Sequence, residues 1–148
     1  MASPKTQLRN AFPKLGPTDF KITSEEDEQY NCVAHAADES GRFWDPMMPP
    51  PYYWPPGVAR EVTLSSFVAA YATKGYEPTD SFDAEKGYEK VAIFVDDQGV
   101  PKHAAKQLPN GRWTSKLGEE WDIEHRTLAG LSGKIYGNPK QALRRRKS

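Results

Sequence analysis

The sequence predicts an α+β domain in which helices near the N-terminus pack on a small antiparallel β-meander. Two helical patterns come first, within residues 29–38 and 63–76, and three consecutive strand candidates joined by short turns follow them. Short connections between consecutive strands favour antiparallel pairing. Helices followed by a run of strands are typical of α+β folds.

The segment "TLSSFVAAYATKGY" (residues 63–76) has the clearest helical pattern. Thr63 can cap the first turn, and Gly75 is expected to end the helix. Four apolar residues recur at i, i+3, i+4 and i+7, the spacing of a buried helix face. These are Leu64, Phe67, Val68 and Tyr71.

The shorter segment "QYNCVAHAAD" (residues 29–38) is expected to form a short helix with Asn31 as its cap. Cys32, His35 and Ala36 have spacings that share one helix face. Cys32 would then lie at the helix start, and it is the single cysteine of the chain.

The strand candidates are residues 90–95, 102–108 and 112–117. The first is apolar on both faces, which predicts a central strand. The second and third are joined by "PNG", where Gly111 can adopt the left-handed conformation of a three-residue turn. This turn makes Leu108 face Arg112 and Ala105 face Ser115.

The length of 148 residues predicts one domain. We expect a polar arm over residues 1–28 with one ordered piece at 20–22, a domain over 29–138, and a basic tail over 139–148. The sequence "RRRK" near the C-terminus leaves sixteen basic against twenty acidic residues in the rest of the chain. A solvated tail on an acidic body argues against nucleic-acid binding.

Several classes of protein are not expected. Apolar runs such as "VAIFV" are too short to span a membrane, and no hydrophobic signal segment is visible, which favours the cytoplasm. A single cysteine allows no internal disulfide, and three dispersed histidines do not predict a metal site. No cofactor is expected, and the sequence predicts no oligomeric state.

Residues 41–58, "GRFWDPMMPPPYYWPPGV", are rich in proline and aromatic residues. Such a segment is expected to form an irregular loop. Its aromatic side chains, which include Trp44 and Trp54, favour packing over the body of the domain. The loop can either cover the core or form one wall of a substrate groove.

A thiol nucleophile needs a lowered pKa, which the start of a helix can supply, and a base, which a neighbouring imidazole can supply. Cys32 meets the first condition, and His103 is the expected base, since His35 on the same helix leaves little room for substrate. Alternation places His103, Ala105 and Gln107 on one strand face, whose small side chains would let a helix approach closely.

A base also needs an orienting partner. Ser115 is the expected one, because the predicted register places it diagonal to His103 on the same face. Gln107 is too far along the strand, whereas Asp122 and His125 are alternatives that could fold back. Lys116, on the opposite face, is expected to be solvated.

The segments "YNCVAHAA", "YYWPPG", "GYEKVAIF", "HAAKQLPNGRWTSKLG" and "DIEH" resemble a family of uncharacterised bacterial proteins classed as a domain of unknown function. The resemblance covers residues 29–138 and implies no activity. The order of Cys32, His103 and Ser115 also resembles papain-like folds of the NlpC and CHAP type. Papain-like enzymes usually have His, Asn, Asp or Gln where this sequence has Ser115.

The papain-like resemblance implies that Cys32 attacks a carbonyl carbon and that His103 accepts and returns the proton. The backbone amide of Cys32 would help to bind the oxyanion. The reaction would be amide or isopeptide hydrolysis, deamidation or acyl transfer, with a peptide or amide substrate. The alternative is a non-catalytic binding module, in which Cys32 is sealed under the Trp44 and Trp54 loop.

Overall fold

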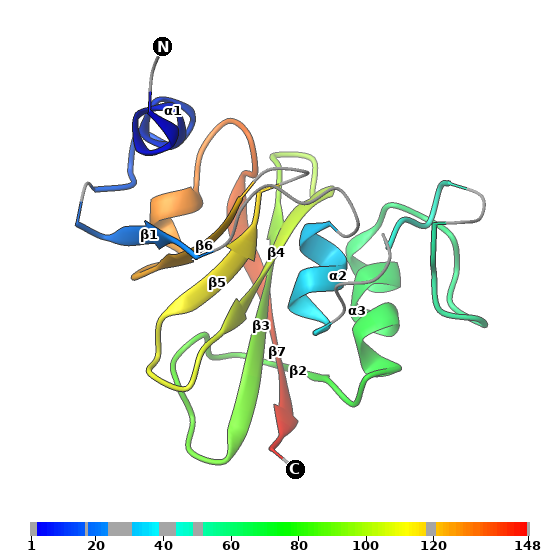
Figure 1. The fold of residues 1–148 in the computed structure, drawn as a ribbon. Helices are drawn as coiled ribbons and strands as arrows, with labels where there is room; N and C mark the ends of the chain where they lie inside the picture. The colour runs from blue at the N-terminus through cyan, green and yellow to red at the C-terminus, as the bar shows by residue number, and fades with distance from the viewer. Residues whose placement is uncertain are drawn as a thin grey trace.

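The computed structural model describes residues 3–16, 18–23, 31–38, 44–48, 52–117 and 121–147. Its strands form one antiparallel sheet in the order β1-β6-β5-β4-β3-β7-β2 (Figure 1). The α+β class is therefore confirmed, with seven strands and few helices in the described part of the chain. In chain order the elements are α1 (Pro4–Ala11), β1 (Phe20–Ile22), α2 (Cys32–Ala36), α3 (Leu64–Ala72), β2 (Glu77–Thr79), β3 (Tyr88–Val95), β4 (Pro101–Gln107), β5 (Trp113–Lys116), β6 (Asp122–His125), the 3-10 helix η1 (Ala129–Leu131) and β7 (Asn138–Arg146).

The predicted meander is present as β3, β4 and β5, which are neighbours in the sheet. The register is the predicted one, with Lys106 opposite Thr114 and Gln107 opposite Trp113. Gly111 has φ +86° in the turn, a conformation that favours glycine. The apolar strand β3 is central, since it lies between β4 and β7.

Helices lie on both faces of the sheet, so they do not form one N-terminal group packed on the meander as expected. Helices α2 and α3 cover one face, and α1 and η1 cover the other (Figure 1). We call the two layers the α2–α3 core and the α1 core. The α2–α3 core includes Val33, Ala34, Phe67, Tyr71, Val91, Ile93, Ala104 and Leu143. The α1 core includes Leu8, Phe12, Ala92, Phe94, Ala105, Trp113, Ile123 and Leu131.

Both predicted helix caps are present. The Asn31 side chain accepts a hydrogen bond from the amide of Ala34, and the Thr63 side chain accepts one from Ser66. Gly75 has φ +90° just after α3, as expected for a helix end. The predicted ordered piece at residues 20–22 is strand β1.

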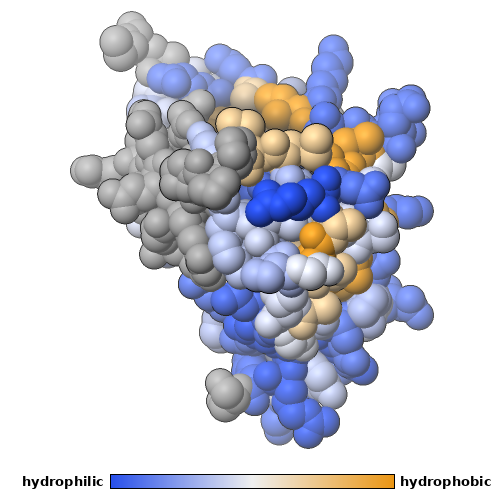
Figure 2. Space-filling view, turned by 90° about the vertical axis from the view of Figure 1, so that its right-hand side faces the viewer, coloured by the Kyte–Doolittle hydropathy of each residue, from blue (hydrophilic) through white to orange (hydrophobic). Residues whose placement is uncertain are grey.

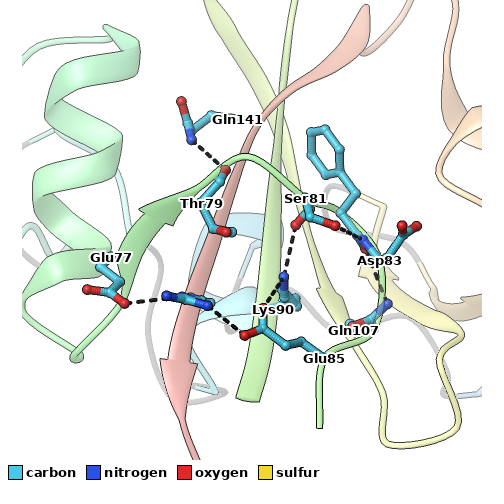
Figure 3. Close-up of polar contacts among 10 residues, drawn as sticks. Glu77, Thr79, Ser81, Asp83, Glu85, Lys90, Gln107 and Gln141 are labelled. Carbon is cyan, nitrogen blue, oxygen red and sulfur yellow. Dashed lines mark hydrogen bonds and ion pairs between the residues drawn. The ribbon is translucent and has the colours of Figure 1, made fainter. Parts of the chain in front are cut away.

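The C-terminal segment is not a solvated tail. It is strand β7, which pairs with β3 along its length and with β2 on its other side. Leu143 is fully buried, and Arg144 forms ion pairs with Glu77 and Glu85 (Figure 3). Arg144 and Arg145 of "RRRK" thus pair with acidic residues from other parts of the chain, and Arg146 contacts Tyr88.

One further expectation differs from the structure. Helix α1 forms within the segment expected to be an arm, and residues 129–131 form the short helix η1. Residues 122–125 form β6, which pairs with both β1 and β5 and extends the meander by one strand. The acidic stretch at 24–28 lies outside the described residues.

The proline-rich loop packs over the body, as expected. Trp44 and Trp54 are buried in the α2–α3 core, and the Trp54 ring lies 5.4 Å from that of Phe67. Met47 and Met48 stay exposed, and Figure 2 shows hydrophobic side chains among hydrophilic ones on one face of the molecule. Residues 41–43 and 49–51 of this segment lie outside the described part.

Candidate functional site

Cys32 is the first residue of α2, as predicted, and Asn31 fixes the position of the helix start. The Asn31 amide group donates to the carbonyl of Trp44 at 2.8 Å, and its oxygen accepts from the Trp44 amide at 3.2 Å. The single side chain therefore caps α2 and ties it to the proline-rich loop.

The Cys32 side chain is half-buried against the α2–α3 core. Burial raises the pKa of its thiol, although backbone hydrogen bonds, the largest from Ala104, lower it in part. The thiol therefore stays protonated near neutral pH. Helix α2 packs against β4, where Cys32 and Ala104 belong to the same core and Ala104 is next to His103 in the sequence.

His103 is fully buried in the sheet on the side of the α1 core. Its ring stacks on that of Tyr136 at 4.0 Å and meets the Phe94 ring edge-on at 5.3 Å. Burial, with smaller contributions from His125 and His35, lowers the pKa of His103 well below its ordinary value. The imidazole is neutral at physiological pH.

Ser115 lies beside His103, as the predicted register requires. The His103 Nε2 and Ser115 Oγ atoms are 2.9 Å apart. A third residue continues this contact, because Ser115 Oγ is also 2.8 Å from His125 Nε2. The other ring nitrogen of His125, Nδ1, lies 2.9 Å from the carbonyl oxygen of Thr127.

The second ring nitrogen of His103 is different. Its Nδ1 atom is buried and has no hydrogen-bond partner among the residues that the structure describes. A buried polar atom without a partner is costly, on the order of 1–3 kcal/mol, so such an atom needs a reason. His103 therefore holds one nitrogen in place and leaves the other available.

Cys32 and His103 are not hydrogen-bonded in this structure. The prediction that α2 packs on the His103 face of β4 is wrong, since α2 packs on the opposite face with Ala104. A polar contact adds to the apolar packing of α2 on that face, because His35 Nε2 lies 2.9 Å from the hydroxyl oxygen of Thr114. His35, which was not expected to be the base, thus anchors α2 to β5.

Lys116 is fully buried, so the expectation that it is solvated is also wrong. Its Nζ atom lies 3.9 Å from the carboxylate of Asp122, and the second carboxylate oxygen lies 3.8 Å from His35 Nδ1. Helix α2 covers this part of the sheet and shields the charges. Asp122 therefore pairs with Lys116 and His35 and does not contact His103 through any described hydrogen bond.

The β4–β5 ladder stops short of His103. Their ladder pairs only two positions, Lys106 with Thr114 and Gln107 with Trp113. Beyond Lys106, toward His103, the strands are bridged by the His103–Ser115 contact instead of by ladder pairing. This gap in the ladder lies next to Ala104, which belongs to the same core as Cys32.

Two cavities flank the site. One of about 500 Å³ is bordered by His35, Thr114 and Lys106. The other, of about 370 Å³, is largely apolar and is bordered by α1 and by Tyr136, whose ring covers His103. Neither Cys32 nor His103 is among the residues that line these two cavities.

His125 is the residue that the sequence analysis ranked only as an alternative. The missing signal was the strand character of residues 122–125, which pairs His125 with Trp113 and Ile123 with Ser115. Alternation along a paired strand then places His125 on the face of Ser115. No group of three His, Cys, Asp or Glu suited to a metal ion occurs among the described residues.

The fold and site define an α+β protein with a single antiparallel sheet, a buried His–Ser–His chain on one face of it and a helix-start cysteine on the other. A family model matches residues 21–144, and the chain belongs to that family, described as Domain of unknown function (DUF7689). No curated protein and no solved structure matches the chain. None of the described helices has the length and apolar character needed to cross a membrane.

The buried histidines predict a loss of stability in acid. Burial lowers the pKa of His125 to about 4 and that of His103 well below 6.5, whereas both take up a proton near 6.5 when unfolded. Below pH 6.5 these two histidines bind protons in the unfolded protein but stay neutral in the folded protein. The contribution of these histidines to the free energy of unfolding is therefore fully present above pH 6.5. It is lost on acidification, by about 1.4 kcal/mol per pH unit for each histidine.

Urea unfolding measured from about pH 7.5 to about pH 5 checks this slope. The His125→Gln variant should show a shallower decline than the parent protein, because it removes one of the two groups. Equal slopes for the two proteins would contradict the assignment of a neutral, buried His125.

Proposed function

We propose that the protein is a cysteine-dependent hydrolase or acyl transferase that acts on an amide or isopeptide bond. Cys32 is the nucleophile, His103 is the general base, and Ser115 orients the base. The observation that carries the proposal is the pair of ring nitrogens of His103, one held by Ser115 and the other without a partner among the described residues.

This division suits a thiol–imidazole pair of papain-like type. One ring nitrogen must accept the proton of the thiol, and the other must be held so that the ring keeps its orientation. Cys32 packs in the same core as Ala104, which is next to His103 in the sequence and beside the gap in the β4–β5 ladder. Cys32 and His103 lie on opposite faces of the sheet, so the pair forms only if the strands rearrange at this gap and bring Sγ to Nδ1. Catalytic hydrogen bonds often tighten only when substrate binds.

The chemistry starts from two neutral groups, since burial raises the pKa of Cys32 and lowers that of His103. His103 Nδ1 takes the proton from Sγ as the sulfur attacks the carbonyl carbon of the amide. The backbone amide of Cys32 donates to the oxyanion that forms. His103 then gives its proton to the leaving nitrogen, and water or an acceptor amine releases the acyl group from the sulfur.

A non-catalytic binding module is the second candidate, and one observation favours it. Cys32 and His103 belong to opposite sides of the sheet, without a hydrogen bond between them, and no described cavity opens over the pair. In this case Cys32 would be a packing residue of the α2–α3 core. A single cysteine suits a reducing compartment such as the cytoplasm under either proposal.

A peptide library with mass-spectrometric detection tests the hydrolase proposal without a known substrate. The library should include isopeptide-linked and glutamine-containing peptides and an added amine acceptor. The expected result is cleavage, deamidation or amine transfer by the parent protein that is lost in both Cys32→Ala and His103→Phe. Products that persist in Cys32→Ala, or a complete lack of Cys32-dependent products, would overturn the proposal in favour of the binding module.

A further inference from the structure

We infer that His125, anchored by the Thr127 carbonyl, sets the tautomer of His103 through the Ser115 hydroxyl and is a positioning residue of the site. The inference rests on the proposed function for its purpose, but its geometry is independent of it. The chain runs over three contacts, His125 Nδ1 to Thr127 O, His125 Nε2 to Ser115 Oγ, and Ser115 Oγ to His103 Nε2.

The backbone carbonyl of Thr127 fixes which atom donates in each of these three hydrogen bonds. A carbonyl oxygen can only accept a hydrogen bond, so the Nδ1 atom of His125, 2.9 Å from Thr127 O, carries a proton. His125 is buried and neutral, and a neutral imidazole carries one proton. Its Nε2 atom is therefore an acceptor.

The serine passes this direction to the second ring. Ser115 has one hydroxyl proton, which it donates to His125 Nε2 at 2.8 Å. Toward His103 it can then only accept, so His103 Nε2 carries the proton of that contact, at 2.9 Å. Because His103 is also neutral, its Nδ1 atom has a lone pair and no proton.

The tautomer derived for His103 agrees with its hydrogen-bond partners. Nδ1 of His103 is the nitrogen that has no described hydrogen bond, and the chain makes it a proton acceptor. A general base needs this state, whereas the opposite tautomer would present an N–H to the thiol. A serine alone could donate in either direction, so His125 supplies the selection that an Asn or Asp would supply in its place.

The buried surroundings keep the hydrogen bonds between His125, Ser115 and His103 in one arrangement. His103, Ser115 and His125 have no exposed surface, and the Phe94 and Tyr136 rings enclose the His103 ring. Water therefore does not compete for these hydrogen bonds, and each bond is stronger than it would be in solvent. A wrong histidine tautomer reduces turnover on the order of 10⁴-fold in serine proteases, which sets the scale of the effect.

The test is a long-range ¹⁵N–¹H correlation spectrum of the histidine side chains in the full chain at neutral pH. The expected spectrum shows a protonated Nδ1 on His125 and a protonated Nε2 on His103, with the other nitrogen of each ring unprotonated. A His103 ring protonated on Nδ1, or a His125 ring protonated on Nε2, would overturn the inference.

Two variants separate positioning from packing. His125→Phe keeps a ring but removes the acceptor, so Ser115 can donate to His103 Nε2 and a share of the His103 rings should carry the proton on Nδ1. His125→Gln offers a side-chain oxygen that can accept from Ser115 and should retain the parental tautomer of His103. An unchanged His103 tautomer in His125→Phe, or loss of the parental tautomer in a folded His125→Gln, would contradict the relay.

The same variants distinguish this inference from the proposed function. Alkylation of Cys32 by iodoacetamide at neutral pH should slow about 10-fold or more in His125→Phe and recover in His125→Gln. If the tautomers are as expected but the alkylation rate does not depend on His103, the proposed function fails and the relay stands. If alkylation depends on His103 but the tautomers are reversed, the relay fails and the proposed function stands.

Discussion

Replacing Leu143 by alanine is expected to lower the free energy of unfolding by about 2–5 kcal/mol. Leu143 is fully buried on β7, pairs with Val91 of the central strand, and packs in the α2–α3 core. Removing its side chain leaves a cavity in the α2–α3 core beside the central strand β3. Urea unfolding monitored by circular dichroism at neutral pH measures the difference.

Lys140→Ala is the matched control, because Lys140 is exposed on the same strand. It should change the free energy of unfolding by no more than about 0.5 kcal/mol. A solvated C-terminal tail predicts equally small effects for both substitutions. Leu143→Ala as mild as Lys140→Ala would therefore contradict the assignment of this segment to the sheet.

The local features of the fold could be predicted from the sequence. The "PNG" turn, the register that it sets between β4 and β5, and the caps at Asn31 and Thr63 all depend on residues close together in the chain. The chemistry of these residues fixes the local backbone, since proline removes a donor and glycine allows a positive φ. The contact between His103 and Ser115 follows from that register.

The long-range arrangement could not be predicted in the same way. Strand β7 is recognisable only when its arginines are matched with Glu77, Glu85 and Glu89, which come from other parts of the chain. Its alternation is weak because long arginine side chains cover the surface and form ion pairs there. A sequence reading that counts only charge therefore assigns the segment to solvent.

The face on which α2 packs depended on a balance that the sequence does not show. Small residues occur on both faces of β4, Ala104 on one and Ala105 on the other. The polar partners of α2 decide between them, since His35 contacts Thr114 and Asp122 on the Ala104 side. The buried charge of Lys116 is tolerated because the Asp122 carboxylate lies beside it.

The second large effect concerns the reactivity of Cys32. His103→Phe preserves a ring between Phe94 and Tyr136 but removes both ring nitrogens. General base catalysis contributes on the order of 10²–10⁴ in rate, so the variant should react with iodoacetamide about 100-fold more slowly at neutral pH. Without the base, no neighbouring group takes the proton of the thiol, whose pKa burial raises.

Two controls keep this comparison specific to the base. His35→Gln removes the other nearby imidazole while retaining a side chain that can bond to Thr114, and it should leave the alkylation rate within about 3-fold of the parent. Circular dichroism and the urea midpoint should show that each variant is folded, so that exposure of Cys32 by unfolding does not raise its rate.

The most direct test of a Cys32–His103 pair is the ratio of the Cys32 alkylation rates of the parent protein and of folded His103→Phe, measured with iodoacetamide at neutral pH. A ratio of about 100 is the result that the proposed function predicts. A ratio near one, with both proteins folded, would show that His103 does not act on the thiol and that Cys32 is a packing residue.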